Sequence, residues 1–536
     1  MPGILDLLAD AATERATLRT IPGPAEPVTL AQVWRRSADA GRYLAHRAGR
    51  GSAVAMMLTT SADCVTALIG GWRAGLCIAS LPTPARAVPM PEYAQQIGAV
   101  LRLMEAKLLV VDDEVASAIP ELPVPVVTFS QTLSGWGAKT ADEAGSFVQF
   151  TSGSTSTPKG VRLSMEAIGE NVRALLDGVA SPDPLVSCSW LPLSHDMGLV
   201  GMFLAAWAGQ RHVSPGGLVL IRPERFLRRP STWLSACAQF GATVTAAPNF
   251  GLELALRDLA GCASLDLSAL RVCIVGAEPV RAETLRRFAK ELAPLRFDSD
   301  ALCPAYGMAE ASLAVSAKPP GKPWNSCHVD TSALEMGRWQ ESGPGEGTTE
   351  LVGLGAPLPG IEVAVGGEPA AVGEVLVRGS SMFDGYLGGA DPRGADRWFP
   401  TRDLGMLRDG ELYVTGRADE VLLVAGRNLY PHDVEEAAAR VGGVRRHCTA
   451  AVAYGPSDYA IVLERPGKLV AEEELKRLCR AVRLEVAKRI GIGPAAVIVI
   501  ARGSFPRTPS GKPQRRRLAA QVALPDAALE LAMHFG

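Results

Sequence analysis

The chain has 536 residues, of which 47% are hydrophobic and 21% are charged, and its formal net charge is −2 at pH 7. This length exceeds what one hydrophobic core normally supports, so two or more globular domains are expected. The near-neutral charge excludes the broad basic surface of a typical nucleic-acid-binding protein.

The ten cysteines form no CxxC pairs and no groups with histidine at metal-ligand spacing, and no secretory signal opens the chain. They are therefore expected to be reduced, mostly buried thiols of a cytoplasmic protein. No uncharged apolar run of about 18 residues or more occurs, so no membrane span is predicted.

Helical and strand patterns alternate from the N-terminus. Amphipathic spacing predicts a helix over 30–50, and a second helix is expected over 64–75. Short apolar runs at 54–58 and 107–112 predict strands. This alternation predicts an α/β fold, a sheet with helical crossovers.

The segment 151–160, Thr-Ser-Gly-Ser-Thr-Ser-Thr-Pro-Lys-Gly, follows a strand-like run at 147–150. Small and hydroxylated side chains let backbone N–H groups approach an anion, and Lys159 adds a positive charge, so the loop suits phosphate groups. It is not a Walker P-loop, because Pro158-Lys159-Gly160 stands where Gly-Lys-Ser/Thr is required. A Ser/Thr-rich surface loop is the alternative.

A helix is expected over 160–174 and a strand over 186–190, followed by a loop that contains His195. An isolated histidine is more often structural than catalytic, but α/β folds bind ligands in the loops that follow strands. A helix over 230–240 and a strand over 242–246 lead to Pro248-Asn249-Phe250.

A buried strand is predicted over 270–275, before the turn Gly276-Ala277-Glu278-Pro279. The segment 318–350 is rich in glycine, proline and polar residues, so we expect a long loop that is either functional or a plain surface excursion. Asp409-Gly410 predicts a tight hairpin turn. Near the C-terminus a helix is expected over 472–490 and a strand over 496–500.

Five motifs together resemble the adenylate-forming superfamily, and most of all its fatty acyl-AMP ligase branch. The motifs are the loop 151–160, Pro-Leu-Ser-His-Asp-Met-Gly at 192–198, Tyr-Gly-Met-Ala-Glu at 306–310, Thr-Arg-Asp-Leu-Gly at 401–405 and Thr-Pro-Ser-Gly-Lys at 508–512. The resemblance implies a large N-terminal α/β adenylation domain over 1–414, a hinge over 415–420 and a small mobile C-terminal lid domain over 421–536. The location of 318–350 resembles the insertion of that branch, which in the family hinders the conformation needed for CoA chemistry.

The resemblance also implies the site residues. Lys512, Glu310 and His195 would be catalytic, Glu310 would hold Mg²⁺, and Asp419 would be the hinge residue. ATP would be bound by Thr151, Ser152, Gly153, Ser154, Thr155, Lys159, Gly276, Ala277, Glu278, Pro279, Tyr306, Gly307, Met308, Ala309, Asp403 and Arg417. The acid would be bound by His195, Asp196, Met197, Met202, Asn249 and Phe250, with Phe203 and Trp207 as further candidates.

The implied function is ATP-dependent activation of a fatty or other hydrophobic carboxylic acid, with transfer to the phosphopantetheine thiol of an acyl carrier protein. One alternative is an acyl-CoA synthetase that uses free CoA, and another is a non-catalytic nucleotide-binding relative. Arg402 departs from the family pattern, in which this position is usually glycine. If Arg402 displaced Asp403, which would hold the ribose hydroxyls, nucleotide affinity would fall.

Overall fold

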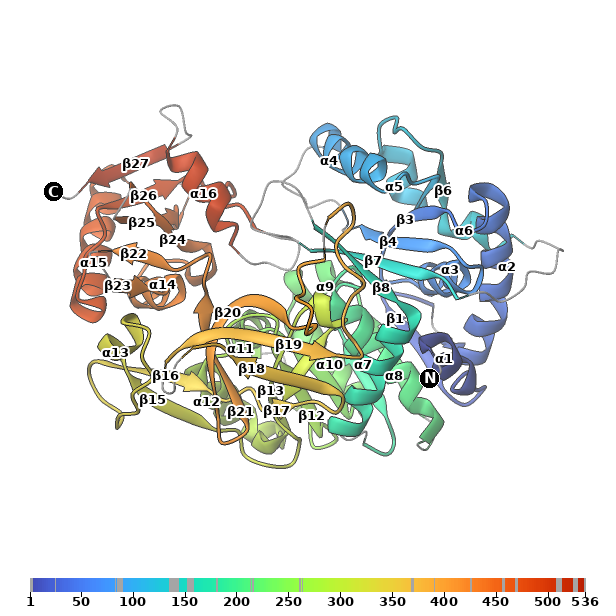
Figure 1. The fold of residues 1–536 in the computed structure, drawn as a ribbon, viewed down its shortest axis with the longest axis horizontal. Helices are drawn as coiled ribbons and strands as arrows, with labels where there is room; N and C mark the ends of the chain where they lie inside the picture. Colours follow the sequence, from blue (N-terminus) through green and yellow to red (C-terminus); the bar gives the residue numbers. More distant parts are fainter. Residues whose placement is uncertain are drawn as a thin grey trace.

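The computed structural model describes residues 3–24, 26–81, 83, 90–134, 144–151, 159–179, 182–212, 214, 216–259, 262, 264–367, 371–389, 391–424, 427–455, 458–467, 471–507, 513–523 and 529–534. A larger N-terminal part holds two mixed sheets flanked by helices, and a smaller α/β unit lies beside it (Figure 1). The α/β class predicted from the sequence is confirmed.

The longest sheet runs in the order β17-β14-β13-β12-β11-β9-β10-β1-β2. Its strands β1, β10, β9, β11, β12 and β13 are parallel, so each needs a crossover connection. The strands are β1 Thr17–Ile21, β2 Val28–Thr29, β9 Val186–Ser189, β10 Gly217–Ile221, β11 Val244–Ala247, β12 Val272–Val275, β13 Leu302–Gly307, β14 Ala314–Ala317 and β17 Ala356–Pro357.

A second sheet runs β6-β5-β3-β4-β7-β8, and only β8 is antiparallel to its neighbour. A third, antiparallel sheet runs β18-β19-β20-β21 and leads to the C-terminal unit. The strands are β3 Ala53–Met57, β4 Cys77–Leu81, β5 Leu108–Val111, β6 Val126–Thr128, β7 Ser146–Thr151, β8 Lys159–Ser164, β18 Ile361–Val365, β19 Gly373–Gly379, β20 Phe399–Arg408 and β21 Glu411–Arg417.

Helices cover both faces of the two large sheets, and separate apolar clusters lie between the sheets and these helices (Figure 1). The helices are α1 Ile4–Asp10, α2 Leu30–Ala48, α3 Ala62–Arg73, α4 Met90–Leu103, α5 Asp113–Ala118, α6 Phe129–Thr132, α7 Met165–Gly178, α8 Ala206–Ala208, α9 Pro223–Arg228, α10 Ser231–Gln239, α11 Asn249–Leu256 and α12 Ala282–Leu292. A π-helix, η1, spans Met197–Ala205, and short 3₁₀ turns include η6 Ala309–Ala311.

The C-terminal unit is a sheet in the order β24-β25-β26-β27, with its own apolar clusters on both faces. A hairpin of β22 and β23 precedes it. Its elements are β22 Leu422–Val424, β23 Arg427–Leu429, α14 Pro431–Ala439, η7 Arg446–Cys448, β24 Thr449–Ala453, β25 Tyr459–Glu464, α15 Glu472–Ile490, β26 Ala496–Ile500, α16 Arg515–Val522 and β27 Leu529–His534. The domain and hinge boundaries expected from the sequence stay predictions.

Local sequence signals account for several element boundaries. The side chain of Thr29 accepts a hydrogen bond from the Gln32 backbone amide, and the Gln32 side chain accepts one from the Thr29 backbone amide, so this capping box starts α2. The expected turn at Asp409-Gly410 is present, with φ of 50° and 79° at the two residues, and it joins β20 to β21. The helix predicted over 472–490 is α15.

Two segments differ from what the sequence predicted. The helix expected over 160–174 begins only at Met165, because residues 159–164 first form β8. In this strand Val161 and Leu163 are buried while Arg162 points to solvent, and Ser164 then caps α7. The segment 318–350 is not a plain loop, since it holds β15 Ser326–Asp330, α13 Thr331–Glu335 and the start of β16 Thr348–Val352.

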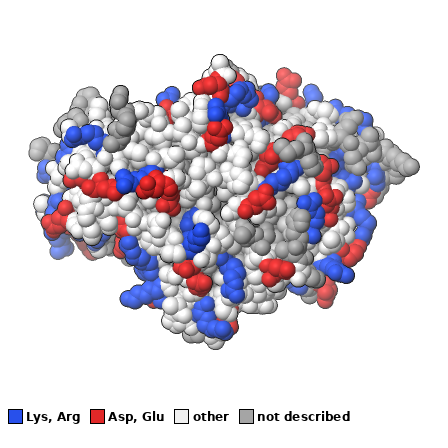
Figure 2. Space-filling model, turned by 60° about the horizontal axis from the view of Figure 1, so that its bottom comes forward, with Lys and Arg blue, Asp and Glu red and all other residues white. Residues whose placement is uncertain are grey.

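Charges of both signs are interspersed on the molecular face that Figure 2 shows. This mixture agrees with the formal net charge of −2. Among the helices in the described ranges, none combines the length and hydropathy needed to cross a membrane.

The buried side chain of Asn171 joins α7 to the segment that leads into β14. Its amide group donates to the carbonyls of Ala311 and Ala314 at 3.0 and 2.8 Å and accepts from the Ala314 amide at 3.1 Å. Asn171→Leu would leave two carbonyls and one N–H buried without partners, so we expect the free energy of unfolding to fall by about 2–4 kcal/mol.

The measurement is the midpoint of thermal unfolding of Asn171→Leu. Asp177→Ala, at an exposed position of the same helix, is the control and should change stability by less than about 0.5 kcal/mol. Equal midpoints for both variants would contradict the proposed importance of this contact.

Candidate active site

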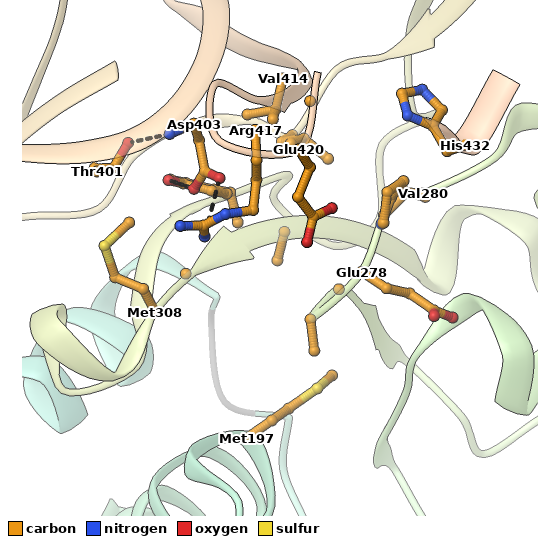
Figure 3. Close-up of a pocket in the computed structure, with 18 of the residues that line it drawn as sticks. Met197, Glu278, Val280, Met308, Thr401, Asp403, Val414, Arg417, Glu420 and His432 are labelled. Carbon is orange, nitrogen blue, oxygen red and sulfur yellow. Dashed lines mark hydrogen bonds and ion pairs between the residues drawn. The ribbon is translucent and has the colours of Figure 1, made fainter. Parts of the chain in front are cut away.

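A cleft of about 2740 Å³ lies between the N-terminal sheets and the C-terminal unit. The carboxyl ends of β12 and β13 open into it, and the start of β20, the end of β21 and the residues up to Glu420 also line it (Figure 3). In open parallel sheets this edge is where ligands bind. Most of the residues predicted from the sequence to form the site line this one cleft.

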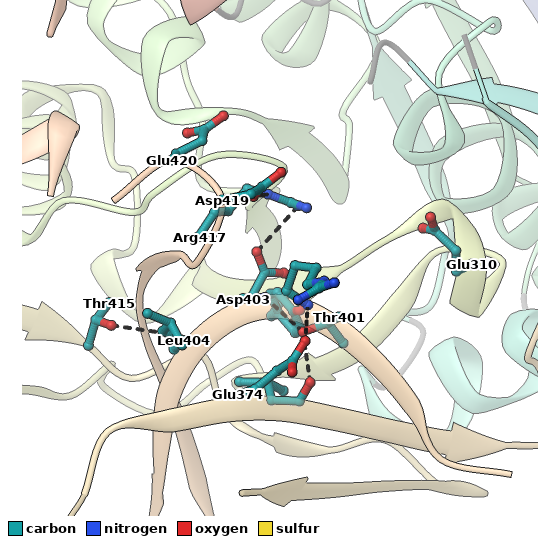
Figure 4. Close-up of polar contacts among 12 residues, drawn as sticks. Glu310, Glu374, Thr401, Asp403, Leu404, Thr415, Arg417, Asp419 and Glu420 are labelled. Atoms are coloured by element: carbon teal, nitrogen blue, oxygen red, sulfur yellow. Dashed lines mark hydrogen bonds and ion pairs between the residues drawn. The ribbon is translucent and has the colours of Figure 1, made fainter. Parts of the chain in front are cut away.

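Asp403 of β20 is the centre of a polar cluster in the cleft wall. Its carboxylate accepts from the Tyr306 hydroxyl at 2.5 Å and pairs with Arg417 at 3.4 Å (Figures 3 and 4). Burial, and then the Asp403 carboxylate, raise the pKa of Tyr306 well above its ordinary value. The phenol therefore stays protonated and orients the carboxylate.

Arg417 of β21 remains a cation in this setting. Burial lowers its pKa, but the carboxylates of Asp403 and Asp419 together raise it above its ordinary value. Asp419 is 3.2 Å from Arg417 and 3.1 Å from Arg516 of α16, so it connects the predicted hinge to the C-terminal unit. Asp403 is 9% exposed and Arg417 is more open, which leaves both within reach of a ligand.

Arg402 does not displace Asp403, contrary to the concern raised by the sequence. Arg402 adopts a left-handed backbone with φ of 66°, the conformation that glycine favours. Its amide donates to Glu374 at 2.8 Å and its carbonyl accepts from Ala418 at 2.8 Å (Figure 4 shows Glu374 beside Asp403). The chain is thus held on both sides, and the exposed Arg402 side chain leaves the carboxylate of Asp403 in the cleft.

Gly276, Ala277, Glu278 and Pro279 form a turn after β12 that lines the cleft. A Cβ at Gly276 would lie 2.8 Å from the Ala305 carbonyl, so only glycine permits this packing. Ala277 also has a left-handed φ, of 67°. Glu278 accepts from the Phe250 amide at 2.5 Å, which fixes the turn against α11.

The segment from Tyr306 to Glu310 follows the turn across the cleft, with Gly307, Met308 and Ala309 in the lining. Glu310 accepts from the Tyr386 hydroxyl at 2.7 Å, and the Lys159 ammonium lies 5.2 Å from the Tyr386 ring centre. Burial and the Glu310 carboxylate raise the pKa of Tyr386, which keeps its hydroxyl a donor. Sequence reasoning missed Tyr386, because it lies 76 residues from Glu310 and belongs to none of the motifs.

His195 and Asp196 line the cleft in the loop that follows β9, and the sequence predicted a loop after a strand at this place. His195 Nδ1 is 2.6 Å from Asp196, whose carboxylate also accepts from the Met197 amide at 2.7 Å. The loop is held from β7, since the Gln149 side chain donates to the Ser194 carbonyl at 2.7 Å. Met197 and Met202 of the π-helix line the adjoining part of the cleft.

The other candidates for acid binding lie elsewhere. Asn249 and Phe250 are not among the residues that line the cleft; Asn249 donates to Thr284 at 3.2 Å and accepts from the Arg281 amide at 3.1 Å. Phe203 and Trp207 are fully buried in the core. Phe203 and Trp207 pack against other buried side chains and do not face the cleft, so their geometry does not support a direct role in acid binding.

Arg515 is a further residue of the cleft wall that sequence reasoning missed. It donates to Glu435 at 2.8 and 2.9 Å and to Glu420 at 2.7 Å, so it joins α16 to α14 and to the segment between β21 and β22. Its only sequence signal was membership of the basic run 515–517, which does not distinguish paired from exposed arginines.

Helix α13, within the predicted insertion, contacts the C-terminal unit. Glu335 is buried and pairs with Arg427 of β23, whose Nε donates at 2.7 Å. Arg427 also donates to the Ile490 carbonyl at 3.2 Å. Burial raises the pKa of Glu335, while Arg427 opposes this rise. The insertion is thereby joined to the hairpin that follows the hinge.

Some predicted residues cannot be placed. The side chain of Thr151, the residues Ser152, Gly153, Ser154 and Thr155, and Lys512 lie outside the described residues. Their roles stay predictions. Lys159 is described and lines the cleft from the start of β8.

Comparison with known proteins gives consistent similarities. The family described as AMP-binding enzyme matches residues 9–387. A 4-hydroxyphenylalkanoate adenylyltransferase of Mycobacterium tuberculosis is 31% identical over 96% of this chain and 90% of its own length. The long-chain-fatty-acid–AMP ligase FadD26 of the same organism is 30% identical over 92% of this chain and 91% of its own.

A solved structure from a study of fatty acyl-adenylate ligases from E. coli and L. pneumophila is similar over almost the whole chain. The TM-score is 0.89 at 29% identity, and the match covers 97% of this chain and 98% of that chain. The C-terminal unit is therefore included in the similarity.

The left-handed backbone at Arg402 gives a stability prediction. Arg402→Gly removes the Cβ that disfavours this conformation, so we expect stability to rise by about 0.5–1 kcal/mol, while Arg402→Val should lower it by about 1–2 kcal/mol. Thermal unfolding of the two variants measures this difference at one position. A more stable valine variant would contradict the strained backbone.

Proposed function

We propose that this chain, which belongs to the AMP-binding enzyme family, activates a hydrophobic carboxylic acid as its acyl-adenylate and transfers the acyl group to a carrier-protein thiol. The observation that carries the proposal is the shared cleft. Asp403 with Arg417, Glu310 with Tyr386, and His195 with Asp196 all face it from different elements.

The two anionic substrates explain this arrangement of charges. A carboxylate oxygen of the acid would attack the α-phosphorus of ATP, and the bond from that phosphorus to the bridging oxygen would break to release pyrophosphate. Because both reactants are negative, the site must supply cations and hydrogen-bond donors and hold the reactants in line. Arg417, Lys159 and, by resemblance, Lys512 are the proposed cations.

Asp403 would bind the ribose of ATP. A carboxylate has enough lone pairs to accept from two vicinal hydroxyls while it also accepts from Tyr306. Tyr306 and the turn from Gly276 to Pro279 border the same part of the cleft, where an adenine ring would lie. The intact geometry around Asp403 argues against a non-catalytic relative.

The residues present fit Mg²⁺ that arrives with ATP. In the described part of the chain no three His, Cys, Asp or Glu side chains are grouped to hold a metal. Mg²⁺ does not need such a group, because it commonly binds one or two carboxylates together with phosphate oxygens and water. Glu310 would supply the carboxylate, and the ion would neutralise charge on the phosphates.

Apolar residues in the lining of the cleft support a hydrophobic acid. Among them are Val244 and Ala246 of β11, Val272 and Ile274 of β12, and Leu175 of α7. The named activities of the relatives span aromatic and long-chain acids, so both classes belong in the test.

We propose a phosphopantetheine thiol of a carrier protein as acceptor. Its sulfur would attack the acyl carbonyl carbon and AMP would leave. Two relatives are named as adenylate-forming rather than CoA-forming enzymes, and the contact of Glu335 with Arg427 joins the insertion to the C-terminal unit. Such a contact would restrain the domain rotation that free CoA requires. Use of free CoA is the alternative.

The domain and location proposals follow from the same scheme. Residues 1–414 would bind the substrates, 415–420 would act as the hinge at Asp419, and 421–536 would act as the lid. The ten cysteines, all in the described part of the chain, form no disulfide, which supports a reducing compartment, and we propose the cytoplasm.

Acid-dependent exchange of pyrophosphate into ATP tests the first step. Medium-chain, long-chain, cyclic and 4-hydroxyphenyl acids are compared, and we expect exchange with one class. Lys512→Ala should lower exchange by about 100-fold or more, because it removes a cation at the reacting phosphate. Glu310→Gln should raise the Mg²⁺ concentration for half-maximal rate by about tenfold. Exchange that is unchanged in Lys512→Ala would refute the assigned mechanism.

Competing acceptors test the second step. With the preferred acid, thioester formation is measured by mass spectrometry with free CoA, pantetheine and a panel of phosphopantetheinylated carrier domains. We expect kcat/KM for at least one carrier domain to exceed that for CoA by about tenfold or more. Robust acyl-CoA formation at a rate equal to that of carrier acylation would favour the synthetase alternative.

A further inference from the structure

Helix α15 presents a basic face to solvent, which the proposed chemistry does not use. Arg477, Arg480, Leu484 and Lys488 are exposed and recur at three- and four-residue spacing, so they lie within about 80° of one another around the helix. We name these four residues the α15 ridge. It extends over about 16 Å of helix.

In the described part of the chain the cations of the α15 ridge form no close ion pair, although Glu473 attracts Arg477 and Arg480, and Glu485 attracts Lys488, over a longer distance. In the described ranges, no carboxylate lies within 4.0 Å of Arg477, Arg480 or Lys488, whereas Lys476 and Arg489 of the same helix pair with glutamates. Leu484 is 70% exposed between them. Because the whole chain has a net charge of −2, this basic ridge is a local feature.

The ridge ends at the active-site cleft. Lys488, with its neighbours Arg489 and Ile490, lines the cleft, and Arg440 of α14 lies in the same wall. Leu334 and Glu335 of α13 line the same cleft, and Glu335 is linked to the end of α15 through Arg427, which donates to the Ile490 carbonyl. In Figure 1 the helix stands at the outer side of the C-terminal unit, with α13 beside its lower end. A partner bound along α15 would therefore be next to an entrance to the cleft.

We propose that the α15 ridge docks the carrier domain, through an acidic helix that also presents an apolar side chain to Leu484. This inference rests on the proposed function. Charge complementarity carries it: three exposed cations at regular spacing, none of them in a close ion pair in the described ranges, attract an acidic face, and one exposed leucine supplies a desolvated contact. The phosphopantetheine arm of a carrier bound there would enter beside Lys488 and Arg440, whose charges suit its phosphodiester.

An anionic membrane surface is the competing occupant for a basic helix. The position of the ridge at the cleft entrance favours the carrier, because a soluble acyl acceptor must reach the acyl-adenylate. A single exposed leucine also offers little apolar surface for insertion into a bilayer.

The test is acyl transfer by Arg477→Glu/Arg480→Glu to a carrier domain that the unaltered enzyme acylates. We expect KM for the carrier to rise about five- to tenfold, and its dependence on salt to weaken, because charges at the rim of an interface act on encounter. Pyrophosphate exchange and acylation of free pantetheine should not change. Leu484→Ala, which alters no charge, should raise KM without changing the salt dependence.

Helix α9 provides a matched control. Arg225 and Arg228 are exposed with the same spacing, Leu227 beside them is 57% exposed, and none of the three lines the cleft. Arg225→Glu/Arg228→Glu should keep the KM for the carrier unchanged. If both double charge reversals raised the carrier KM equally, the change in the overall charge of the protein would explain the effect, and the ridge proposal would be overturned.

The remaining outcomes are also decisive. A carrier KM unchanged in both Arg477→Glu/Arg480→Glu and Leu484→Ala overturns the ridge proposal while the proposed function stands. Acylation of pantetheine but of no carrier domain shows that the proposed acceptor is wrong, and the ridge proposal falls with it. Binding to phosphatidylglycerol vesicles that is lost in Arg477→Glu/Arg480→Glu, with carrier KM unchanged, assigns the ridge to a membrane instead.

Discussion

The carboxylate of Asp403 is the group on which the arrangement of the cleft depends. It is held between the Tyr306 hydroxyl from β13 and the Arg417 guanidinium from β21, so it links the longest sheet to the last strand of the β18–β21 sheet. A buried carboxylate is stable only where donors and cations surround it. The same donors orient it, so the proposed ribose contact would use a group that the fold has already positioned.

Two residues that line the cleft have a strained backbone. Ala277 and Arg402 both have left-handed φ values, which cost free energy for residues other than glycine. At Arg402 the flanking hydrogen bonds to Glu374 and Ala418 hold the conformation. The fold thus carries an unfavourable backbone conformation next to the residue that would bind ribose. Hydrogen bonds and packing in the surrounding sheets hold this conformation in place.

Regular, local signals made much of the fold predictable. The period of apolar residues located α2 and α15, and Asp409-Gly410 located a hairpin, because each depends on residues close in sequence. The pairs of Tyr386 with Glu310 and of Arg515 with Glu435 could not be predicted, since each forms only when distant segments meet. Phe203 and Trp207 were expected in the acid pocket because they lie near a motif, but they are buried in the core. An aromatic side chain fits either environment, so its position in the sequence does not distinguish the two.

The π-helix from Met197 to Ala205 has a consequence for how acid preference can change in evolution. Its hydrogen bonds span one residue more than those of an α-helix, so removal of a single residue can restore an α-helix without breaking the fold. That change would rotate every following side chain, Met202 among them, relative to the cleft. Insertions and deletions of one residue are therefore a route to new specificity here, in discrete steps that point substitutions do not offer.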